Sequence, residues 1–145
     1  MDRRSTQLDE IAEALPQRSA ALSRLFLTRT SVCVSRTEVG VLRKLRDAPR
    51  RITELASEER VTQPAITLLV NRLQERGWVE RIPDPSDGRA VLVSLTPAGA
   101  EVFERLRAEY RALMHEEMAS LDDAEVETLA AAIEILDKVI ARLGS

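Results

Sequence analysis

The stretch from Trp78 to Thr96 constrains the fold of this 145-residue chain more than any other. Two short runs rich in apolar residues flank a proline-containing turn, which ends in Asp87, Gly88 and Arg89. An Asp-Gly pair between two such runs is typical of a β-hairpin, because glycine accepts the backbone angles of a tight turn. We therefore predict a hairpin that carries one cation, Arg89, at its tip.

Two short helices are predicted immediately before this hairpin. Thr53 can cap the first, and residues 60–62 form a turn that leads into the second. Thr62 can cap the second helix, Pro64 lies in its first turn, where a missing N–H costs nothing, and Gly77 ends it. Helix, turn, helix and a basic hairpin in this order are the parts of a winged-helix domain. The pattern therefore favours binding to double-stranded DNA.

The second of these helices has one apolar and one polar face. Ile66, Leu69, Val70 and Leu73 fall on the same side at helical spacing, which predicts that this side is buried. The opposite side, called the outer face below, ends at Glu75. It consists of Pro64, Thr67, Leu68, Asn71 and Arg72.

The outer face has the side chains that a helix in the major groove needs. Asn71 can pair with adenine and Arg72 with guanine, each good bidentate contact giving about 1–3 kcal/mol of discrimination. Thr67 is a short polar side chain, while Leu68 and Pro64 can contact a thymine methyl group. A polar helix face by itself is more often only solvated, but its place between a short helix and a hairpin favours DNA recognition.

The hairpin and several nearby residues complete the predicted DNA-binding surface. Arg89 can enter a minor groove, where narrow A·T tracts attract guanidinium groups. Asp87 either holds that side chain through an ion pair or is simply the aspartate of an Asp-Gly turn. The caps of the two short helices are expected near phosphates. Further phosphate contacts are expected at Ser35, Arg36 and Arg51.

Amphipathic helices precede this segment. Residues 6–28 have helical apolar spacing, and Pro16 within them favours a kink over two shorter helices that abut. Ser35 and Glu38 match a capping box, which predicts that a further helix opens there and runs to about Asp47.

Two more helices follow the hairpin. Thr96 and Pro97 open one that extends to about Ser120, and residues 122–125 offer the cap of the last. Apolar residues of the last helix repeat at mixed threes and fours, as in a coiled-coil seam. We expect the seams of the first and last helices to bury a dimer interface. Its predicted residues are Leu8, Ile11, Leu15, Leu129, Ile133, Leu136 and Ile140.

The predicted fold is mainly α with a small antiparallel β-hairpin wing. It divides into an N-terminal helix at 1–34, a winged helix-turn-helix domain at 35–96 and C-terminal dimerisation helices at 97–145. The length and the apolar content of 44% suit one domain, or one small domain with an extension.

The distribution of charge supports this division, although the formal net charge of −3 does not suggest a DNA-binding protein. Residues 36–96 hold 11 Lys/Arg and 9 Asp/Glu, whereas residues 97–145 hold 5 and 11. A mildly basic middle beside an acidic end suggests one surface that faces DNA and a second that DNA does not touch.

The sequence gives no support for a metal site, a cofactor or an enzyme. Cys33 and His115 are each the only residue of their type, so no intrachain disulfide and no Cys- or His-cluster metal site can form. A Gly-rich phosphate loop and a nucleophile with a histidine partner are both missing from the sequence. Because no apolar run approaches the roughly 20 residues of a membrane span and the start does not resemble a secretory signal, we expect a cytoplasmic protein without membrane contact.

Four segments have a more specific pattern. They are the helix start at 52–56, the run at 70–81, Asp-Pro-Ser-Asp-Gly-Arg at 84–89 and Leu-Thr-Pro-Ala-Gly at 95–99. Together with the flanking helices they resemble the MarR family, the multiple-antibiotic-resistance type of winged-helix repressor. The hairpin motif with its Leu-Thr-Pro-x-Gly helix start is specific to this resemblance, whereas a helix-turn-helix alone is not.

The resemblance implies a homodimer on a pseudo-palindromic operator, with recognition helices in successive major grooves and wings in the flanking minor grooves. It implies a repressor rather than an activator, released by a small aromatic or phenolic ligand or by an oxidant. Arg89 would be the minor-groove residue. The major-groove set would be Thr62, Gln63, Pro64, Thr67, Leu68, Asn71 and Arg72. Many members have arginine where this chain has Leu68, which leaves the operator sequence open.

Ligands in the family often lodge between the dimer helices and the DNA-binding lobe. The resemblance therefore implies that a pocket is lined by Leu22, Phe26, Leu42 and Phe103. Plain hydrophobic core is the alternative for each of these residues. The family's redox sensors carry their cysteine near the start of the first helix, so the resemblance does not extend to Cys33.

Two alternatives to the ligand-released regulator stay open at this stage. One is a helical adaptor that binds a protein partner and uses the winged helix only as a scaffold. The other is an oxidant sensor that acts through Cys33. A lone cysteine between helices is expected to be a small buried hydrophobe, but Arg29 and Arg36 nearby would favour a thiolate.

Overall fold

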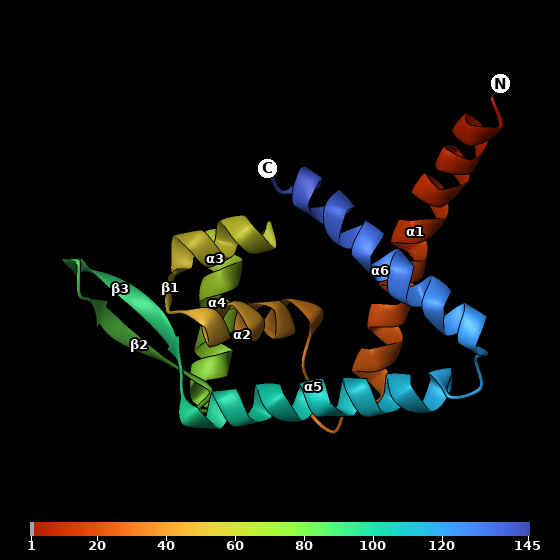
Figure 1. The fold of residues 1–145 in the computed structure, drawn as a ribbon. Coiled ribbons are helices and arrows are strands. Elements are labelled where there is room, and N and C mark those ends of the chain that lie inside the picture. Colours follow the sequence, from red (N-terminus) through yellow and green to blue (C-terminus); the bar gives the residue numbers. More distant parts are fainter. Residues whose placement is uncertain (1) are drawn as a thin grey trace. The chain divides into compact units, whose positions relative to one another are not determined.

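The computed structural model describes residues 2–145, which form six helices and one small sheet (Figure 1). The helices are α1 (Arg3–Thr28), α2 (Arg36–Asp47), α3 (Ile52–Glu59), α4 (Gln63–Glu75), α5 (Pro97–Met118) and α6 (Asp123–Leu143). The strands are β1 (Arg50–Arg51), β2 (Val79–Asp84) and β3 (Asp87–Leu95). Two compact units result, one that ends at Glu109 and one from Tyr110 to Ser145. The predicted mainly α fold with a β-hairpin is confirmed.

The predicted helix-turn-helix consists of α3 and α4. Arg60 ends α3 in the left-handed conformation, with φ of 56°. Thr62 caps α4, because its hydroxyl accepts a hydrogen bond from the Ala65 N–H at 3.3 Å. Gly77, with φ of 77°, follows the end of α4, as predicted for a residue without a Cβ.

The predicted cap at Thr53 is wrong, because α3 begins at Ile52 and Arg51, two residues before Thr53, occupies the cap position. The Arg51 N–H donates to the Glu54 carboxylate at 3.4 Å. Arg50 and Arg51 pair with β3 immediately before the helix, so the chain passes directly from strand to helix. Two residues are too few for a strand pattern that could be recognised in the sequence.

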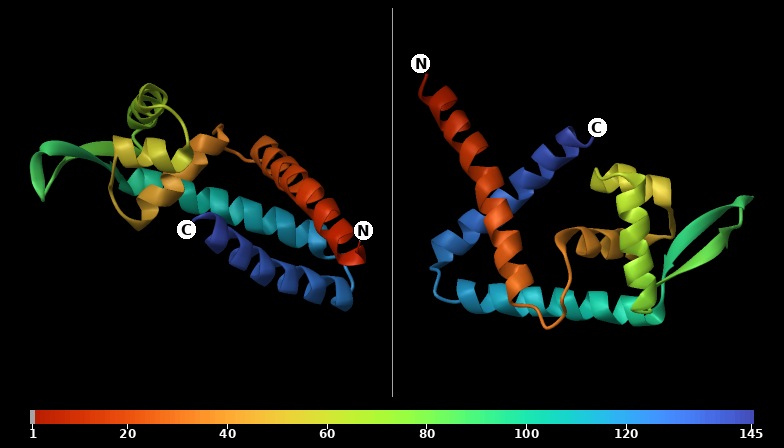
Figure 2. Two further views of the ribbon diagram at one scale, coloured as in Figure 1. Left: turned by 90° about the horizontal axis from the view of Figure 1, so that it is seen from above. Right: turned by 180° about the vertical axis from the view of Figure 1, so that it is seen from behind.

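The sheet is antiparallel with the order β1-β3-β2. Val79 pairs with Leu95 at its base, and the register shifts between Pro83 and Asp84 near the tip. The hairpin of β2 and β3 projects beyond α2, α3 and α4 in all three views of the first unit (Figures 1 and 2). The predicted hairpin is confirmed, but the placement of its turn at Asp87 and Gly88 is wrong. The turn consists of Pro85 and Ser86, between the paired Asp84 and Asp87, and Gly88 lies in β3. Proline presets the backbone angle of the first turn position, which favours the turn at Pro85.

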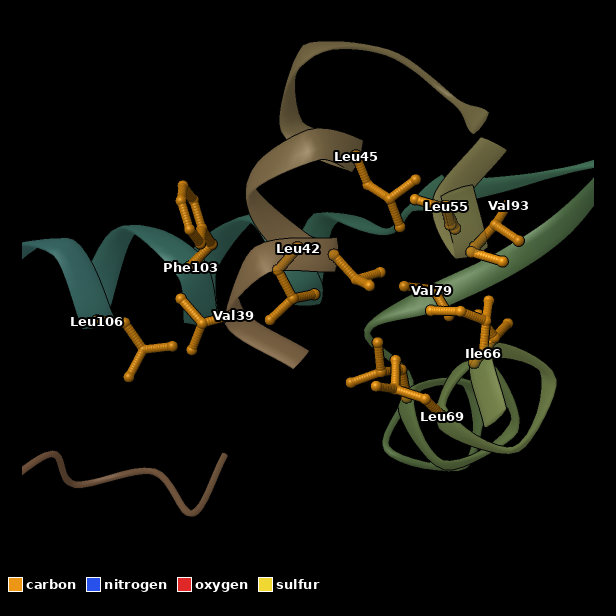
Figure 3. Packing of buried hydrophobic residues seen from close by; sticks show 14 residues of the cluster. Val39, Leu42, Leu45, Leu55, Ile66, Leu69, Val79, Val93, Phe103 and Leu106 are labelled. Atoms are coloured by element: carbon orange, nitrogen blue, oxygen red, sulfur yellow. The ribbon is translucent and has the colours of Figure 1, made fainter. Parts of the chain in front are cut away.

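One hydrophobic core holds the helix-turn-helix, the sheet and the start of α5 together (Figure 3). All four residues predicted for the inner side of α4 belong to it. The core consists of Val39, Val41, Leu42, Leu45, Leu55, Ala56, Ile66, Leu69, Val70, Leu73, Val79, Val93, Phe103 and Leu106. Because α4 packs through one side only, its outer face is fixed in direction by the core.

The start of α5 forms a close joint with the end of α4. The Thr96 hydroxyl donates to the Gly77 carbonyl at 2.6 Å and accepts from the Gly99 N–H at 3.1 Å, so it caps α5 as predicted. The Thr96 N–H also donates to the Trp78 carbonyl at 3.0 Å. A Cβ on Gly99 would lie 2.0 Å from that carbonyl oxygen, which explains why the Leu-Thr-Pro-Ala-Gly segment ends in glycine.

The helices α1, α2 and α6 largely begin and continue where the local sequence predicts. α1 continues through Pro16 as one helix, so the alternative of two abutting helices is wrong. Asp122 caps α6, since its side chain accepts from the Glu125 N–H at 2.8 Å while the Glu125 side chain accepts from the Asp122 N–H at 3.0 Å. At α2 only half of the predicted capping box forms. The Ser35 hydroxyl accepts from the Glu38 N–H at 3.1 Å, but the Glu38 carboxylate points elsewhere.

Candidate nucleic-acid interface

The outer face of α4 is exposed along its length. Each of its five residues, together with the preceding Gln63 and the Thr62 cap, is open to solvent. Leu68 is 61% exposed although it is a large apolar side chain. The sequence-predicted major-groove residues are therefore brought together on one accessible surface, and none of them is part of the core.

Arg72 of α4 forms an ion pair with a buried carboxylate of α2. Glu38 of α2 lies with its Oε1 3.9 Å from Arg72 Nε and its Oε2 4.0 Å from Arg76 Nη1. Glu38 is buried, whereas the Arg72 side chain remains 59% exposed. This ion pair restricts the Arg72 guanidinium without covering it, and the sequence did not predict it.

Arg76, the last residue before Gly77, is a second connection that the sequence did not predict. Its Nη1 donates to the Cys33 carbonyl at 2.8 Å, and its guanidinium lies 4.6 Å from the centre of the Trp78 ring. The side chain thus ties the end of α4 to the loop before α2. Cys33 itself is exposed, so the expectation of a small buried hydrophobe is wrong. Val32 and Val34 on either side of Cys33 pack against the core, and Cys33 between them is exposed.

The tip of the hairpin presents Arg89 to solvent. Asp87 Oδ1 accepts a hydrogen bond from the Arg89 backbone N–H at 3.1 Å. The structure therefore shows a contact between Asp87 and the backbone of Arg89, which lies in β3, three residues after the turn at Pro85 and Ser86. A cation at the end of a projecting hairpin is free to reach a neighbouring groove.

The hairpin is anchored at Asp84, the last residue of β2, which directly precedes the turn. The Asp84 carboxylate accepts from Arg51 Nη2 at 2.7 Å and Nε at 3.1 Å, and from the Ser86 N–H at 2.9 Å and hydroxyl at 2.8 Å. These bonds, with the Ser86 N–H as the largest cause and Arg51 next, lower the pKa of Asp84 from 3.8 to about 2. The same contact raises the pKa of Arg51.

The anchor should make the stability of the protein pH-dependent through Asp84. Because the pKa in the folded chain lies below the ordinary value, the stabilising effect is complete above about pH 4 and is lost as the pH falls toward about 2. We expect the difference in urea midpoint between the wild type and Asp84→Asn to be constant from about pH 5 to 7 and to shrink below about pH 4. A difference that persists unchanged to pH 2 would contradict this origin.

The residues predicted to contact phosphates differ in exposure and in how many of their hydrogen-bonding groups are already engaged. Ser35 and Arg36 are exposed at the start of α2, with the Ser35 hydroxyl engaged as the cap. Arg51 uses Nε and one N–H of Nη2 for Asp84, which leaves the second N–H of Nη2 and both of Nη1 for a further partner. Its main structural role is to hold the hairpin.

The four residues predicted to line a ligand pocket do not share one environment. Leu42 and Phe103 belong to the hydrophobic core, where the Arg46 guanidinium lies 5.3 Å from the centre of the Phe103 ring (Figure 3). Phe26 is half-buried and Leu22 is exposed. For Leu42 and Phe103 the alternative of plain core matches their packing.

The predicted dimer residues lie on surfaces that the single chain leaves largely open. Leu15 and Leu136 are half-buried. The other five are exposed by 45% to 63%, and they are Leu8, Ile11, Leu129, Ile133 and Ile140. Large apolar side chains in such a row are unusual on the surface of a protein that acts alone.

Other kinds of site find no support in the described part of the chain. Residues 2–145 contain no group of three or more His, Cys, Asp or Glu that could hold a metal ion. Across the same residues, no helix has the length and apolar character needed to cross a bilayer.

The sequence of the winged-helix segment is similar to that of known proteins. The model of the MarR family matches residues 34–91. An uncharacterized HTH-type transcriptional regulator of Mycobacterium bovis is 37% identical over 82 residues, which are 57% of this chain and 57% of that protein. The chain thus spans little more than half of that relative. YpoP, an uncharacterized HTH-type transcriptional regulator of Bacillus subtilis, is 30% identical over 106 residues, or 72% of this chain and 75% of YpoP.

A solved structure extends the similarity over most of the chain. The crystal structure of wild-type MarR from E. coli superposes with a TM-score of 0.70 and 30% identity, covering 89% of this chain and 96% of that one. The chain belongs to the MarR family. The relatives from Mycobacterium bovis and Bacillus subtilis are named as HTH-type transcriptional regulators. The resemblance stated from the sequence is confirmed.

Proposed function

We propose that the chain is a homodimeric, sequence-specific DNA-binding protein that represses transcription from a pseudo-palindromic operator. The outer face of α4 would enter the major groove, and Arg89 would enter the adjacent minor groove. The observation that carries the proposal is the exposed outer face on a helix held by the core, beside a hairpin with an exposed cation at its tip. Base edges would be read by the outer face, while Ser35 and Arg36 would contact phosphates.

A dimer is proposed because of the open apolar rows on α1 and α6. Covering these side chains with a second copy would remove apolar surface from water, which is the main favourable term in protein association. Two copies related by a two-fold axis would present two α4 helices to one side of a duplex. Half-sites about one helical turn apart, roughly 34 Å, would then match the two helices.

Release of the DNA by a small aromatic or phenolic ligand is part of the proposal and is supported by the family resemblance. Leu22 and Phe26 on α1 are the pocket candidates that remain accessible or half-accessible in the single chain. Oxidant sensing through Cys33 is a second candidate mode of release, favoured by the exposure of Cys33 and by the bond from its carbonyl to Arg76.

Fluorescence anisotropy tests the proposed function with DNA from upstream of the reading frame, scrambled DNA and a salt series. We expect tighter binding to the upstream DNA and a steep loss of affinity with salt. Arg89→Ala should weaken binding about 10-fold or more, because a hydrogen bond to a charged group contributes about 1.5–3 kcal/mol, and should lower the salt slope by about 1.

Arg105→Ala is the matched control, since Arg105 is an exposed arginine on α5 outside the proposed surface. It should leave both the affinity and the salt slope close to those of the wild type. An equal loss in the two variants would mean that Arg89 acts only through net charge. No binding even at low salt would instead favour the protein-binding adaptor.

A further inference from the structure

A guanidinium from the hairpin lies against the outer face of α4. Arg81 of β2 donates from Nη2 to Asn71 Oδ1 at 2.8 Å and from Nη1 to the side-chain carbonyl oxygen of Gln74. All three side chains are exposed. Because both partners are neutral amides, these contacts leave the positive charge of Arg81 uncompensated.

The chemistry of Arg81 fixes the orientation of both amides. A guanidinium has only N–H donors, so the atom that faces it must be the amide oxygen. Asn71 therefore turns its carbonyl toward β2 and keeps its two N–H groups for other partners, and the same holds for Gln74. Around Asn71, the outer face consequently offers N–H donors next to a cation.

This arrangement bears on the base that Asn71 can read. Bidentate pairing of asparagine with adenine needs both ends of the amide, since the oxygen accepts from the N6 amino group while the N–H donates to N7. With Oδ1 beside Arg81, an adenine amino group would bring its positively polarised hydrogens close to a guanidinium. Guanine presents two acceptors in the major groove, O6 and N7, which suit N–H donors and a nearby cation.

We propose that Arg81 is a specificity-determining positioning residue, which makes Asn71 of the outer face, together with the neighbouring Gln74, a donor-only surface selective for guanine. The inference rests on the proposed function, in which the outer face reads base edges. It replaces the adenine contact that residue type alone suggested for Asn71.

The test measures base preference at each operator position for the wild type and three variants, using a sequence that the wild type selects from random DNA. Asn71→Ala should flatten the preference at one position of each half-site, which identifies the base that Asn71 reads. In the wild type this base should be guanine, and adenine there should bind about 5- to 100-fold more weakly, as expected for one good contact. Replacing the guanine with 7-deazaguanine should also weaken binding.

Arg81→Ala frees Asn71 Oδ1 and Gln74 Oε1 and should shift the preference at the Asn71 position toward adenine, while positions that neither amide contacts keep their preference. Arg89→Ala is the control, because it should lower affinity for every sequence without changing this preference. Arg81 is exposed, so the alanine variant should fold. Arg81→Met, which keeps much of the length of the side chain without its donors, should give the same shift.

The outcomes separate the inference from the function on which it rests. A wild-type preference for adenine at the Asn71 position, no flattened position in Asn71→Ala, or an unchanged preference in both Arg81 variants would overturn the role of Arg81 while sequence-specific binding remained. Equal binding of the wild type to all DNA would overturn the proposed function, and the inference with it.

Discussion

Replacing Leu136 and Ile140 together with aspartate is expected to convert the protein to a monomer and abolish specific operator binding. Ile140 is 63% exposed in the single chain, and Leu136 lies one turn before it on the same side of α6. An uncompensated charge buried in an interface costs about 3–5 kcal/mol, so the dimer dissociation constant should rise at least about 100-fold. Sedimentation velocity measures the assembly state, and anisotropy measures the loss of operator affinity.

Ala131→Asp with Ala141→Asp supplies the matched control. Both alanines are exposed on α6, on the side that carries Glu127 and Glu134, so the control adds the same two charges to the same helix. It should remain a dimer and bind DNA like the wild type. If the Leu136/Ile140 variant sedimented as a dimer, the interface would lie elsewhere. If it were monomeric and still bound the operator with wild-type affinity, dimerisation would not position the two α4 helices.

Substituting Gly99 should have the largest effect on the stability of the fold. An added Cβ would meet the Trp78 carbonyl oxygen at 2.0 Å and the Leu95 Cδ1 at 2.8 Å. The oxygen belongs to the backbone and also accepts a hydrogen bond from the Thr96 N–H. It therefore cannot move away without breaking the contact between the end of α4 and the start of α5. Overpacking in a core costs about 1–3 kcal/mol and occasionally more, and we expect Gly99→Ala to cost at least about 3 kcal/mol in urea unfolding.

Gly88→Ala is the control for this prediction. Gly88 lies in β3 just after the turn at Pro85 and Ser86, where an added Cβ would meet nothing within 4 Å and where the backbone is not left-handed. A surface change of this kind is worth about 0.5 kcal/mol or less. Equal unfolding midpoints for the two variants would show that the contact between Gly99 and Trp78 does not limit the packing of α5.

Signals contained in a few neighbouring residues were sufficient to predict most of the fold. The caps at Thr62, Thr96 and Asp122 depend on hydrogen bonds between residues three apart, which sequence reveals directly. The Asp-Gly pair predicted the hairpin but not its turn, because Pro85 and Ser86 form the turn instead. The burial of one side of α4 follows from its helical period. Thr53 was assigned wrongly because a two-residue strand, visible only in the folded chain, occupies the residues before α3.

The ion pairs that hold the outer face and the hairpin in place could not be predicted from local sequence. Glu38 approaches Arg72 and Arg76 only because α2 packs under α4, and Arg51 meets Asp84 across 33 residues of sequence. In both cases the tertiary fold decides which charges meet. The exposure of Cys33 was missed because burial was judged from residue type. Residues 29–35 alternate between exposed and half-buried, and Val32 and Val34 take the inward positions on either side of Cys33.

The contact between Asn71 and Arg81 is an intermediate case. The two residues are 10 apart in sequence and lie on either side of the turn at Gly77, so a strand that leaves this turn passes close to the end of α4. The short separation in sequence was therefore enough to predict that Arg81 lies near Asn71. The orientation of the Asn71 amide required the contact itself.

The measurement that tests the central claim most directly is selection of binding sites from a pool of random duplexes by the purified wild-type protein, followed by sequencing. We predict enrichment of an inverted repeat whose half-sites are centred about 10 base pairs apart, with A·T-rich flanks where Arg89 would enter the minor groove. A pool that stays random after repeated rounds at moderate salt would contradict sequence-specific binding. Enrichment of a single half-site without its inverted copy would contradict a dimer that reads DNA with two α4 helices.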